Sequence, residues 1–148
     1  MIKQKPYRIY LDNCCFNRPY DDQTYLLVQL ETEAKLFVQK GILLQMFELV
    51  WSYILDYENS ANPYQNRKSA ISKWKNLAVL DINASDSVVN CGKEIMQQAI
   101  KKKDALHIAC AIEAKCDYFL TTDKRLLNAS FNEIEVINPI DFIKILGI

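Results

Sequence analysis

Short apolar runs that suit β-strands alternate along the chain with longer segments of helical periodicity, and this alternation constrains the fold more than any other feature. Residues 7–11 (YRIYL) have the aromatic and β-branched composition of a strand, which we expect to end at Asp12. Four further strands are expected, at residues 46–51, 77–82, 118–121 and 134–137. Because helical segments lie between them, the pattern predicts an α/β fold with a mostly parallel central sheet covered on both faces.

The segments between the expected strands carry the residues that start and stop helices. Residues 13–22 are expected to form a loop, after which Asp22 caps a helix over 23–40 that ends at Gly41. Ser52 is expected to open a short helix directly after the second strand. Further helices are expected over 64–76, over 86–101 with Ser85 as its cap, over 104–115, and from Pro139 to the C-terminus.

The bulk composition suits a single domain. The 148 residues include only 3 glycines and 4 prolines, and no linker, repeat or low-complexity tract interrupts them. Half of the residues are hydrophobic, enough to bury one core over residues 1–148. There is no run of about 20 apolar residues, and the N-terminal segment lacks the apolar stretch and cleavage site of a signal peptide. We therefore expect a cytoplasmic domain without a membrane span.

The cysteines favour neither a zinc site nor a disulfide framework. Their number, 5, is odd, two are adjacent, and none forms a CxxC pair. Free cysteine packs as a small hydrophobe, so we expect buried, reduced thiols. The five are Cys14, Cys15, Cys91, Cys110 and Cys116.

Three aspartates fall at the expected ends of strands and starts of helices. Asp12 and Asp123 follow two of the strands, and Asp104 begins an apolar helix. The carboxyl ends of parallel strands share one edge of the sheet, so we expect the three carboxylates to converge there. Like charges raise one another's pKa, and a divalent cation would relieve the repulsion. The sequence therefore predicts a metal site, although each aspartate taken alone is equally typical of a helix cap.

The donor types restrict which metal and which chemistry fit. Carboxylate oxygens suit Mg²⁺ or Mn²⁺ better than zinc, and the single histidine, His107, rules out a nitrogen-rich site. Sites made only of acids serve phosphoryl chemistry, and the chain has neither a P-loop nor a GxGxxG motif. His107 lies one turn beyond Asp104 and can hydrogen-bond a site carboxylate, but packing in the core is the favoured interpretation.

The charge balance argues against a tight, nonspecific nucleic-acid binder. The 18 basic and 18 acidic residues give a formal net charge of zero. The lysine run at 101–103, directly before Asp104, would offset this locally, although a solvated helix end is the simpler interpretation. Tyr20, Trp51 and Tyr57 can stack on RNA bases, but packing in the core or at its rim is favoured for each.

Four sequence segments together resemble the PIN domain, the fold of the VapC-type ribonuclease toxins and their relatives. They are YLDNCCFNRP, SYILDYE, KDALHIACAIEAKCDYFLTTDKRLL and VINPIDF, and the resemblance extends over essentially the whole chain. The segment over residues 103–127 is the most specific of the four. The resemblance implies a three-layer α/β/α sandwich and endonucleolytic cleavage of RNA that depends on Mg²⁺ or Mn²⁺.

The resemblance also assigns residues to the expected metal and catalytic site. Asp12 matches the acid after the first strand, Asp104 the acid that opens the buried helix, and Asp123 the acid of a turn that includes Thr121. A fourth acid follows the second strand, where Glu58 fits best but Asp56 is an alternative. Asn13 and Ser52 are expected to support the acids or to contact substrate.

Partners follow from the same resemblance. A toxin of this kind would pair with a small antitoxin that blocks the acids, and relatives commonly form homodimers. The helix that carries Leu26, Leu30 and Phe37 is a candidate dimer surface. The alternative function is a non-catalytic PIN-like module that binds RNA or a protein. A phosphoryl-accepting receiver domain is excluded, because Asn13 follows Asp12 where a second acid is required and Asn138-Pro139 stand where a lysine is required.

Overall fold

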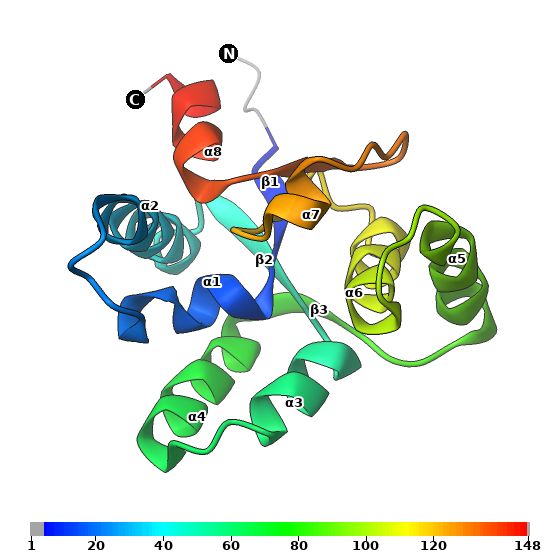
Figure 1. The fold of residues 1–148 in the computed structure, drawn as a ribbon, viewed down its shortest axis with the longest axis horizontal. Coiled ribbons are helices and arrows are strands. Elements are labelled where there is room, and N and C mark those ends of the chain that lie inside the picture. Colours follow the sequence, from blue (N-terminus) through cyan, green and yellow to red (C-terminus); the bar gives the residue numbers. More distant parts are fainter. Residues whose placement is uncertain (1–4, 148) are drawn as a thin grey trace.

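The computed structural model describes residues 5–147 and contains one five-stranded sheet in which every described pairing is parallel (Figure 1). The strand order is β3-β2-β1-β4-β5, so the first strand lies at the centre. The strands are β1 (Tyr7–Leu11), β2 (Phe47–Ser52), β3 (Ala78–Ile82), β4 (Tyr118–Leu120) and β5 (Glu135–Ile137). The predicted α/β class, the parallel sheet and the five strand positions are confirmed.

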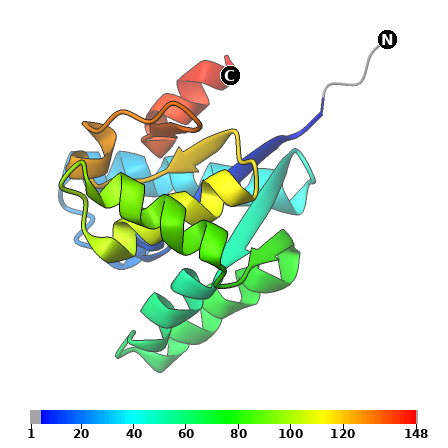
Figure 2. The ribbon, with the colours of Figure 1, turned by 90° about the vertical axis from the view of Figure 1, so that its right-hand side faces the viewer.

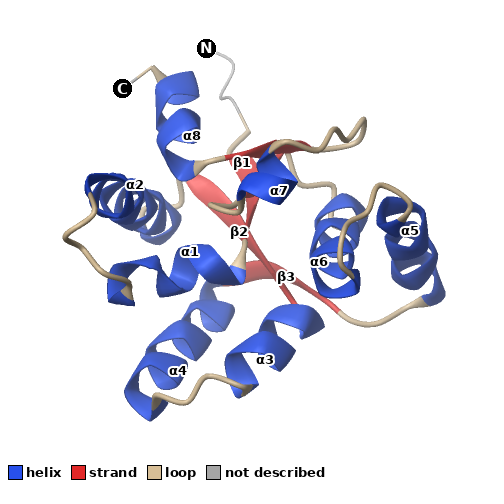
Figure 3. Cartoon of the chain, viewed as in Figure 1, coloured by secondary structure: helices blue, strands red, loops and turns tan. Residues whose placement is uncertain are grey.

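Helices cover both faces of the sheet, as in a PIN-like α/β/α sandwich. Helices α2 and α8 lie on one side and α5 and α6 on the other, with the strands between them (Figures 1 and 3). Turned by 90°, the molecule shows α5 and α6 packed side by side (Figure 2). The helices are α1 (Asn13–Asn17), α2 (Leu26–Leu43), α3 (Tyr53–Ser60), α4 (Gln65–Ser72), α5 (Asp86–Met96), α6 (Lys102–Glu113), α7 (Lys124–Leu127) and α8 (Pro139–Leu146). Two short 3₁₀ helices, η1 (Arg18–Tyr20) and η2 (Lys73–Leu77), follow α1 and α4.

Among the described residues, no helix has both the length and the hydropathy needed to cross a membrane.

The core is built around the central strand. Ile9, Tyr10 and Leu11 of β1 are completely buried, and the Tyr10 ring stacks on Phe119 of β4 with centroids 5.1 Å apart. Burial of each large side chain of this kind stabilises the fold by about 1.5–3 kcal/mol. A strand this central holds its C-terminal end rigidly, and that end is where Asp12 follows.

Three of the expected helix starts are confirmed. Ser52 accepts a hydrogen bond from the Leu55 amide at 3.3 Å, and Ser85 accepts one from the Val88 amide at 3.2 Å. Pro139 stands in the first turn of α8, directly after its cap residue Asn138. The side chains of Ser52 and Ser85 satisfy amides that have no partner inside the helix, and proline suits a first turn because it has no amide N–H. Both are contacts within a few residues, which explains why the local sequence located these helix starts.

The expected loop over residues 13–22 is wrong, because α1 and η1 occupy most of it. Asp12 caps α1 by accepting a hydrogen bond from the Asn13 amide at 2.8 Å. The short helix then buries Cys15 and Phe16 beneath it. Helices this short are formed by such packing rather than by their own propensity, so no periodicity marks them.

The expected boundaries of α2 are also wrong. Asp22 bonds Thr24 instead of capping the helix, which begins only after Tyr25. Gly41 lies inside the helix and does not end it: the Phe47 ring packs so closely that a Cβ on Gly41 would stand 2.3 Å from Phe47 Cε2. Gly41 thus allows the Phe47 ring to approach the helix backbone closely and does not form the turn that would end the helix.

Two other helices end earlier than expected. Helix α5 stops at Met96, and shortly beyond it Ala99 has a positive φ of 63°, which helical backbone does not adopt. The segment expected to be helical up to residue 76 changes to the 3₁₀ helix η2 after Ser72.

Candidate active site

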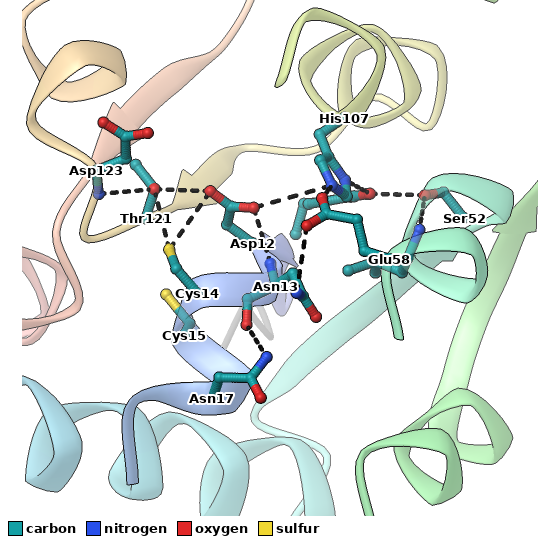
Figure 4. Close-up of polar contacts among 12 residues, drawn as sticks. Asp12, Asn13, Cys14, Cys15, Asn17, Ser52, Glu58, His107, Thr121 and Asp123 are labelled. Carbon is teal, nitrogen blue, oxygen red and sulfur yellow. Dashed lines mark hydrogen bonds and ion pairs between the residues drawn. The ribbon is translucent and has the colours of Figure 1, made fainter. Parts of the chain in front are cut away.

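The register of β1 and β4 brings Asp12 and Thr121 side by side. Leu11 pairs with Leu120, and the Asp12 amide donates a hydrogen bond to the Leu120 carbonyl at 3.0 Å. The Thr121 hydroxyl then donates to Asp12 Oδ2 at 2.8 Å and accepts from the Asp123 amide at 3.1 Å (Figure 4). Thr121 thus links the two acids that follow these neighbouring strands.

All four acids expected from the sequence line one pocket of about 380 Å³. They come from the ends of β1 and β4, from α3 and from the first turn of α6, elements far apart in the chain. Asp12 is buried, whereas Glu58, Asp104 and Asp123 are partly exposed. The pocket is lined by Asp12, Asn13, Cys14, Asn17, Asp21, Glu58, Asp104 and Asp123.

The simple capping interpretation holds for two of the three aspartates. Asp12 caps α1, and Asp123 caps α7 by accepting from the Arg125 amide at 2.9 Å. Asp104 caps nothing: it is the third residue of α6, and the position before that helix is Lys101. Its carboxylate has no hydrogen-bond or ion-pair partner among residues 5–147, so Asp104 is left facing the pocket.

Glu58 lines the pocket, whereas Asp56 does not. Asp56 accepts a hydrogen bond from the Trp51 indole at 2.9 Å and pairs with Lys75 at 3.0 Å. Glu58 is held on the pocket side, where Asn13 Nδ2 donates to its Oε2 at 3.2 Å. Of the two acids left open by the sequence, the geometry therefore favours Glu58.

His107 is buried as expected, but it is also part of the site. Its Nε2 is hydrogen-bonded to Glu58 Oε1, and its Nδ1 shares a hydrogen bond of 2.5 Å with the Tyr10 hydroxyl. The Tyr10 hydroxyl in turn shares a hydrogen bond of 2.6 Å with the Ser52 hydroxyl. One ligand atom from each of Asp12, Glu58 and His107 lies within 4.8 Å of the others, a spacing that could hold a metal ion.

Ser52 is connected to the pocket acid Glu58 indirectly, through Tyr10 and His107. It also caps α3. Nothing in the sequence distinguishes Tyr10 from an ordinary core residue, and its role depends on the register of β1 against β2 and on the packing of α6. Asn17, also not anticipated, donates to the Asn13 carbonyl at 3.0 Å and lines the pocket.

Burial and mutual repulsion disfavour full ionisation of two acids. Burial raises the pKa of Asp12 well above its usual range, and the neighbouring Cys14 adds to this. Partial burial and the nearby Asp123 raise the pKa of Asp104. Partial burial also opposes ionisation of Glu58, but His107, Lys103 and Asn13 outweigh it and lower the pKa of that carboxyl. The site is therefore built to gain from a cation.

The expectation of buried thiols is correct for Cys15, Cys110 and Cys116 but not for Cys91 and Cys14, which are only partly buried. Cys14 also lines the pocket. Its Sγ lies 3.5 Å from Asp12 Oδ2 and 3.4 Å from Thr121 Oγ1. A hydrogen bond from Cys15 and others from Thr121 and Thr122 lower the pKa of Cys14 to about 6 despite its burial. All five cysteines are free.

The donor set fits a hard divalent cation. Carboxylate oxygens dominate the pocket, and Asn13 Oδ1 is buried beside them with no hydrogen-bond partner among the described residues. A buried acceptor without a partner is costly unless a ligand, ion or water satisfies it. Oxygen ligands of this kind suit Mg²⁺ or Mn²⁺.

Comparison with known protein families agrees with this geometry. A model of the PIN domain family matches residues 9–132, which include β2, β3, β4, most of β1 and all four pocket acids. No curated protein matches the chain. Domains of this family are generally nucleases and usually use divalent metals. The chain belongs to the PIN domain family.

Proposed function

We propose that the protein is a divalent-metal-dependent endoribonuclease. The observation that carries this proposal is the convergence of four acids from distant parts of the chain on one pocket. A purely structural role would not require Asp104 and Glu58 to face the same opening as two helix caps. The membership of the PIN domain family supports the same function.

In this proposal Asp12, Glu58, Asp104 and Asp123 are the catalytic acids and hold Mg²⁺ or Mn²⁺. A metal held by these acids would supply Lewis-acid polarisation of the phosphodiester and a bound water molecule of lowered pKa as the nucleophile. Thr121 orients the Asp12 carboxylate through its 2.8 Å hydrogen bond. His107 orients Glu58 from behind, and Asn13 Nδ2 donates a hydrogen bond to the other oxygen of the same carboxylate.

The surface beside the pocket supports RNA as the substrate despite the zero net charge of the chain. Lys102 and Lys103 line a neighbouring hollow of about 390 Å³ together with Tyr57, whose side chain is 67% exposed. Basic groups can hold phosphates and an exposed ring can stack on a base of single-stranded RNA. Of the three aromatic residues considered for stacking, Trp51 is instead a core residue with 1% exposure.

Incubation of the purified protein with a panel of single-stranded and structured RNAs tests the proposal. We expect cleavage in Mg²⁺ or Mn²⁺, no cleavage in excess EDTA, and 5′ and 3′ fragments that both accumulate, as an endonuclease requires. The Asp104→Ala variant, purified identically, should be inactive and so exclude a contaminating ribonuclease. If the wild type neither cleaves any RNA nor binds Mn²⁺, the chain is instead a PIN module that binds RNA or protein without cleaving.

Metal binding should stabilise the protein, and more strongly as the pH rises. The pKa values of Asp12 and Asp104 are raised in the folded protein, so the metal-free folded state binds protons at these carboxyls more tightly than the unfolded state does. At low pH this proton binding stabilises the metal-free fold. This increment of stability is lost as the pH rises through those pKa values, and the ionised form that accumulates is the one that binds metal. Mn²⁺ at about 100 times its Kd contributes about 2.7 kcal/mol, a rise in Tm of roughly 5–10 °C.

Thermal unfolding with and without Mn²⁺ at about pH 5 and about pH 8 measures this effect. The rise in Tm should be the larger at the higher pH and should be lost in Asp104→Asn. The Asp86→Asn variant, an exposed aspartate in the first turn of α5, is the matched control and should respond like the wild type. A rise in Tm that is equal at both pH values would contradict the role assigned to Asp12 and Asp104.

We further propose that the protein is the toxin of a toxin–antitoxin pair and a homodimer. The resemblance of its motifs to VapC-type toxins supports both, and an antitoxin would act by covering the acid pocket. The first half of α2 and the residue before it form the proposed dimer surface, since four apolar residues there are 43% to 67% exposed. They are Tyr25, Leu26, Leu27 and Leu30, whereas Phe37, expected on the same surface, is partly buried.

A further inference from the structure

A second pocket adjoins the acid pocket on the side away from Tyr57. It has a volume of about 470 Å³ and is lined by residues 98–101, between α5 and α6, and by residues 125, 126 and 128–130, in and after α7. Asp104 lines both pockets. The two hollows are therefore adjacent, and a ligand in the second pocket would stand next to a group held by the acids.

The lining combines an apolar floor with a polar rim. Ile100 and Leu126 are buried at the floor. The rim carries two amides, a hydroxyl and two cations, all exposed, and within residues 5–147 none of their side chains makes a hydrogen bond or an ion pair. These five rim residues are Gln98, Asn128, Ser130, Lys101 and Arg125. Their donors and acceptors remain available to a ligand.

This combination fits a nucleotide better than other small ligands. The Lys101 and Arg125 cations suit a phosphate, the Gln98 and Asn128 amides can donate to and accept from the edge of a base, and the apolar floor suits the face of a base. The volume lies in the range of about 300–1,000 Å³ found for small-ligand sites. Bases of RNA are read in this way when they are unpaired and turned out of the strand.

The positions of the lysines at 101–103 support the same substrate path. Lys101 lines the second pocket, whereas Lys102 and Lys103 line the hollow with Tyr57, so the three cations lie on both sides of Asp104. A phosphate backbone that crosses the acid pocket would meet a cation before and after it. The lysine run is thus more than a solvated helix end.

We propose that the second pocket binds one unpaired nucleotide of the RNA substrate, next to the phosphodiester that is cleaved. Gln98 and Asn128 contact its base and so determine a sequence preference at that position, while Lys101 and Arg125 hold its phosphate. The inference rests on the proposed ribonuclease function for the identity of the ligand, but nucleotide binding can be measured without cleavage.

The test uses the full-length, ¹⁵N-labelled protein without metal and the four ribonucleoside 5′-monophosphates as probes. The side-chain amide signals of Gln98 and Asn128 in ¹H–¹⁵N spectra, identified by their loss in Gln98→Ala and Asn128→Ala, should shift saturably, and one base should bind more tightly than the others. Arg125→Ala should weaken binding by about tenfold, because it removes a charged phosphate contact. Lys93→Ala, an exposed lysine of α5 outside the pocket, is the charge-matched control and should leave binding unchanged.

A second arm compares cleavage of RNAs that differ in the single nucleotide on either side of the cleaved bond. The wild type should prefer one base at one of these positions, and Asn128→Ala should lose the preference while it still cleaves the poorest substrate. If RNA is cleaved but no monophosphate shifts either amide signal and the preference survives in Asn128→Ala, the pocket inference is overturned and the ribonuclease function stands. Saturable amide shifts without any RNA cleavage would support the nucleotide pocket and overturn the ribonuclease function alone.

Discussion

Asp12→Asn is expected to lower the rate of metal-dependent RNA cleavage by more than about 100-fold, because groups that only orient metal ligands are already worth about 10–100-fold. Asp12 is the most buried of the four acids and stands at the end of the central strand. The substitution removes its charge but keeps one oxygen, which can still accept from the Asn13 amide as Oδ1 does, so the cap of α1 is preserved. The new NH₂ group takes the place of Oδ2, which accepts from the Thr121 hydroxyl in the wild type, and can donate to that hydroxyl instead. The loss should therefore be one of chemistry and metal binding, not of folding.

Single-turnover cleavage of the best RNA from the panel measures this effect, alongside thermal unfolding of the same samples. Burial raises the pKa of Asp12, so ionisation of this carboxyl near neutral pH costs the fold stability. The substitution removes that cost, and the metal-free variant should therefore unfold at the same temperature as the wild type or above it. Asp86→Asn is again the control and should retain full activity. A variant that unfolds at a much lower temperature, or one that cleaves at a wild-type rate, would show that Asp12 serves the fold instead of the reaction.

Gly41→Ala is expected to destabilise the protein by about 1–3 kcal/mol, although alanine is the better helix former by about 1 kcal/mol. Gly41 lies inside α2, and a Cβ there would stand 2.3 Å from Cε2 and 2.5 Å from Cδ2 of the Phe47 ring. Phe47 is buried at the start of β2 and packs on Phe142 of α8, with ring centroids 5.3 Å apart. The ring cannot move away without opening that contact, so the helix must shift.

Urea unfolding of the wild type and the variant measures this cost. Glu33→Ala, at an exposed position of the same helix, should change stability by no more than about 0.5 kcal/mol. Adding Phe47→Leu should make the glycine substitution less costly, because the ring that meets the new Cβ is gone. Gly41→Ala would argue against close packing at this point if it raised stability as it does in an open helix.

Local chemistry explains how much of the fold could be predicted. The five strands were located because each is a short run of aromatic and β-branched residues, and Ser52, Ser85 and Pro139 mark helix starts through contacts within a few residues. Helix α1 has no such local signal: it exists because Cys15 and Phe16 bury beneath it. Gly41 likewise gives the local signal of a helix end, which the distant Phe47 overrides.

The pocket acids also differ in whether local sequence or tertiary packing decides their role. Asp12, Asp104 and Asp123 could be predicted because their positions at strand ends and at a helix start follow from local patterns and parallel topology. The choice between Asp56 and Glu58 could not. Two residues apart on a helix, they point about 200° away from each other. Only the packing of α3 decides that Asp56 meets Trp51 and Lys75 while Glu58 meets His107.

The sequence by itself determined the alternation of strands and helices, the parallel sheet and the three aspartates that its topology gathers, because each depends on periodicity or on contacts between near neighbours. Only the tertiary structure decided which further groups join them. Tyr10 and His107 become part of the site through strand register and helix packing, and Lys101 becomes part of a second pocket through the approach of α7. The hydrogen bonds of His107 to Glu58 and to Tyr10 join residues about 50 to 100 positions apart, and no local pattern encodes them.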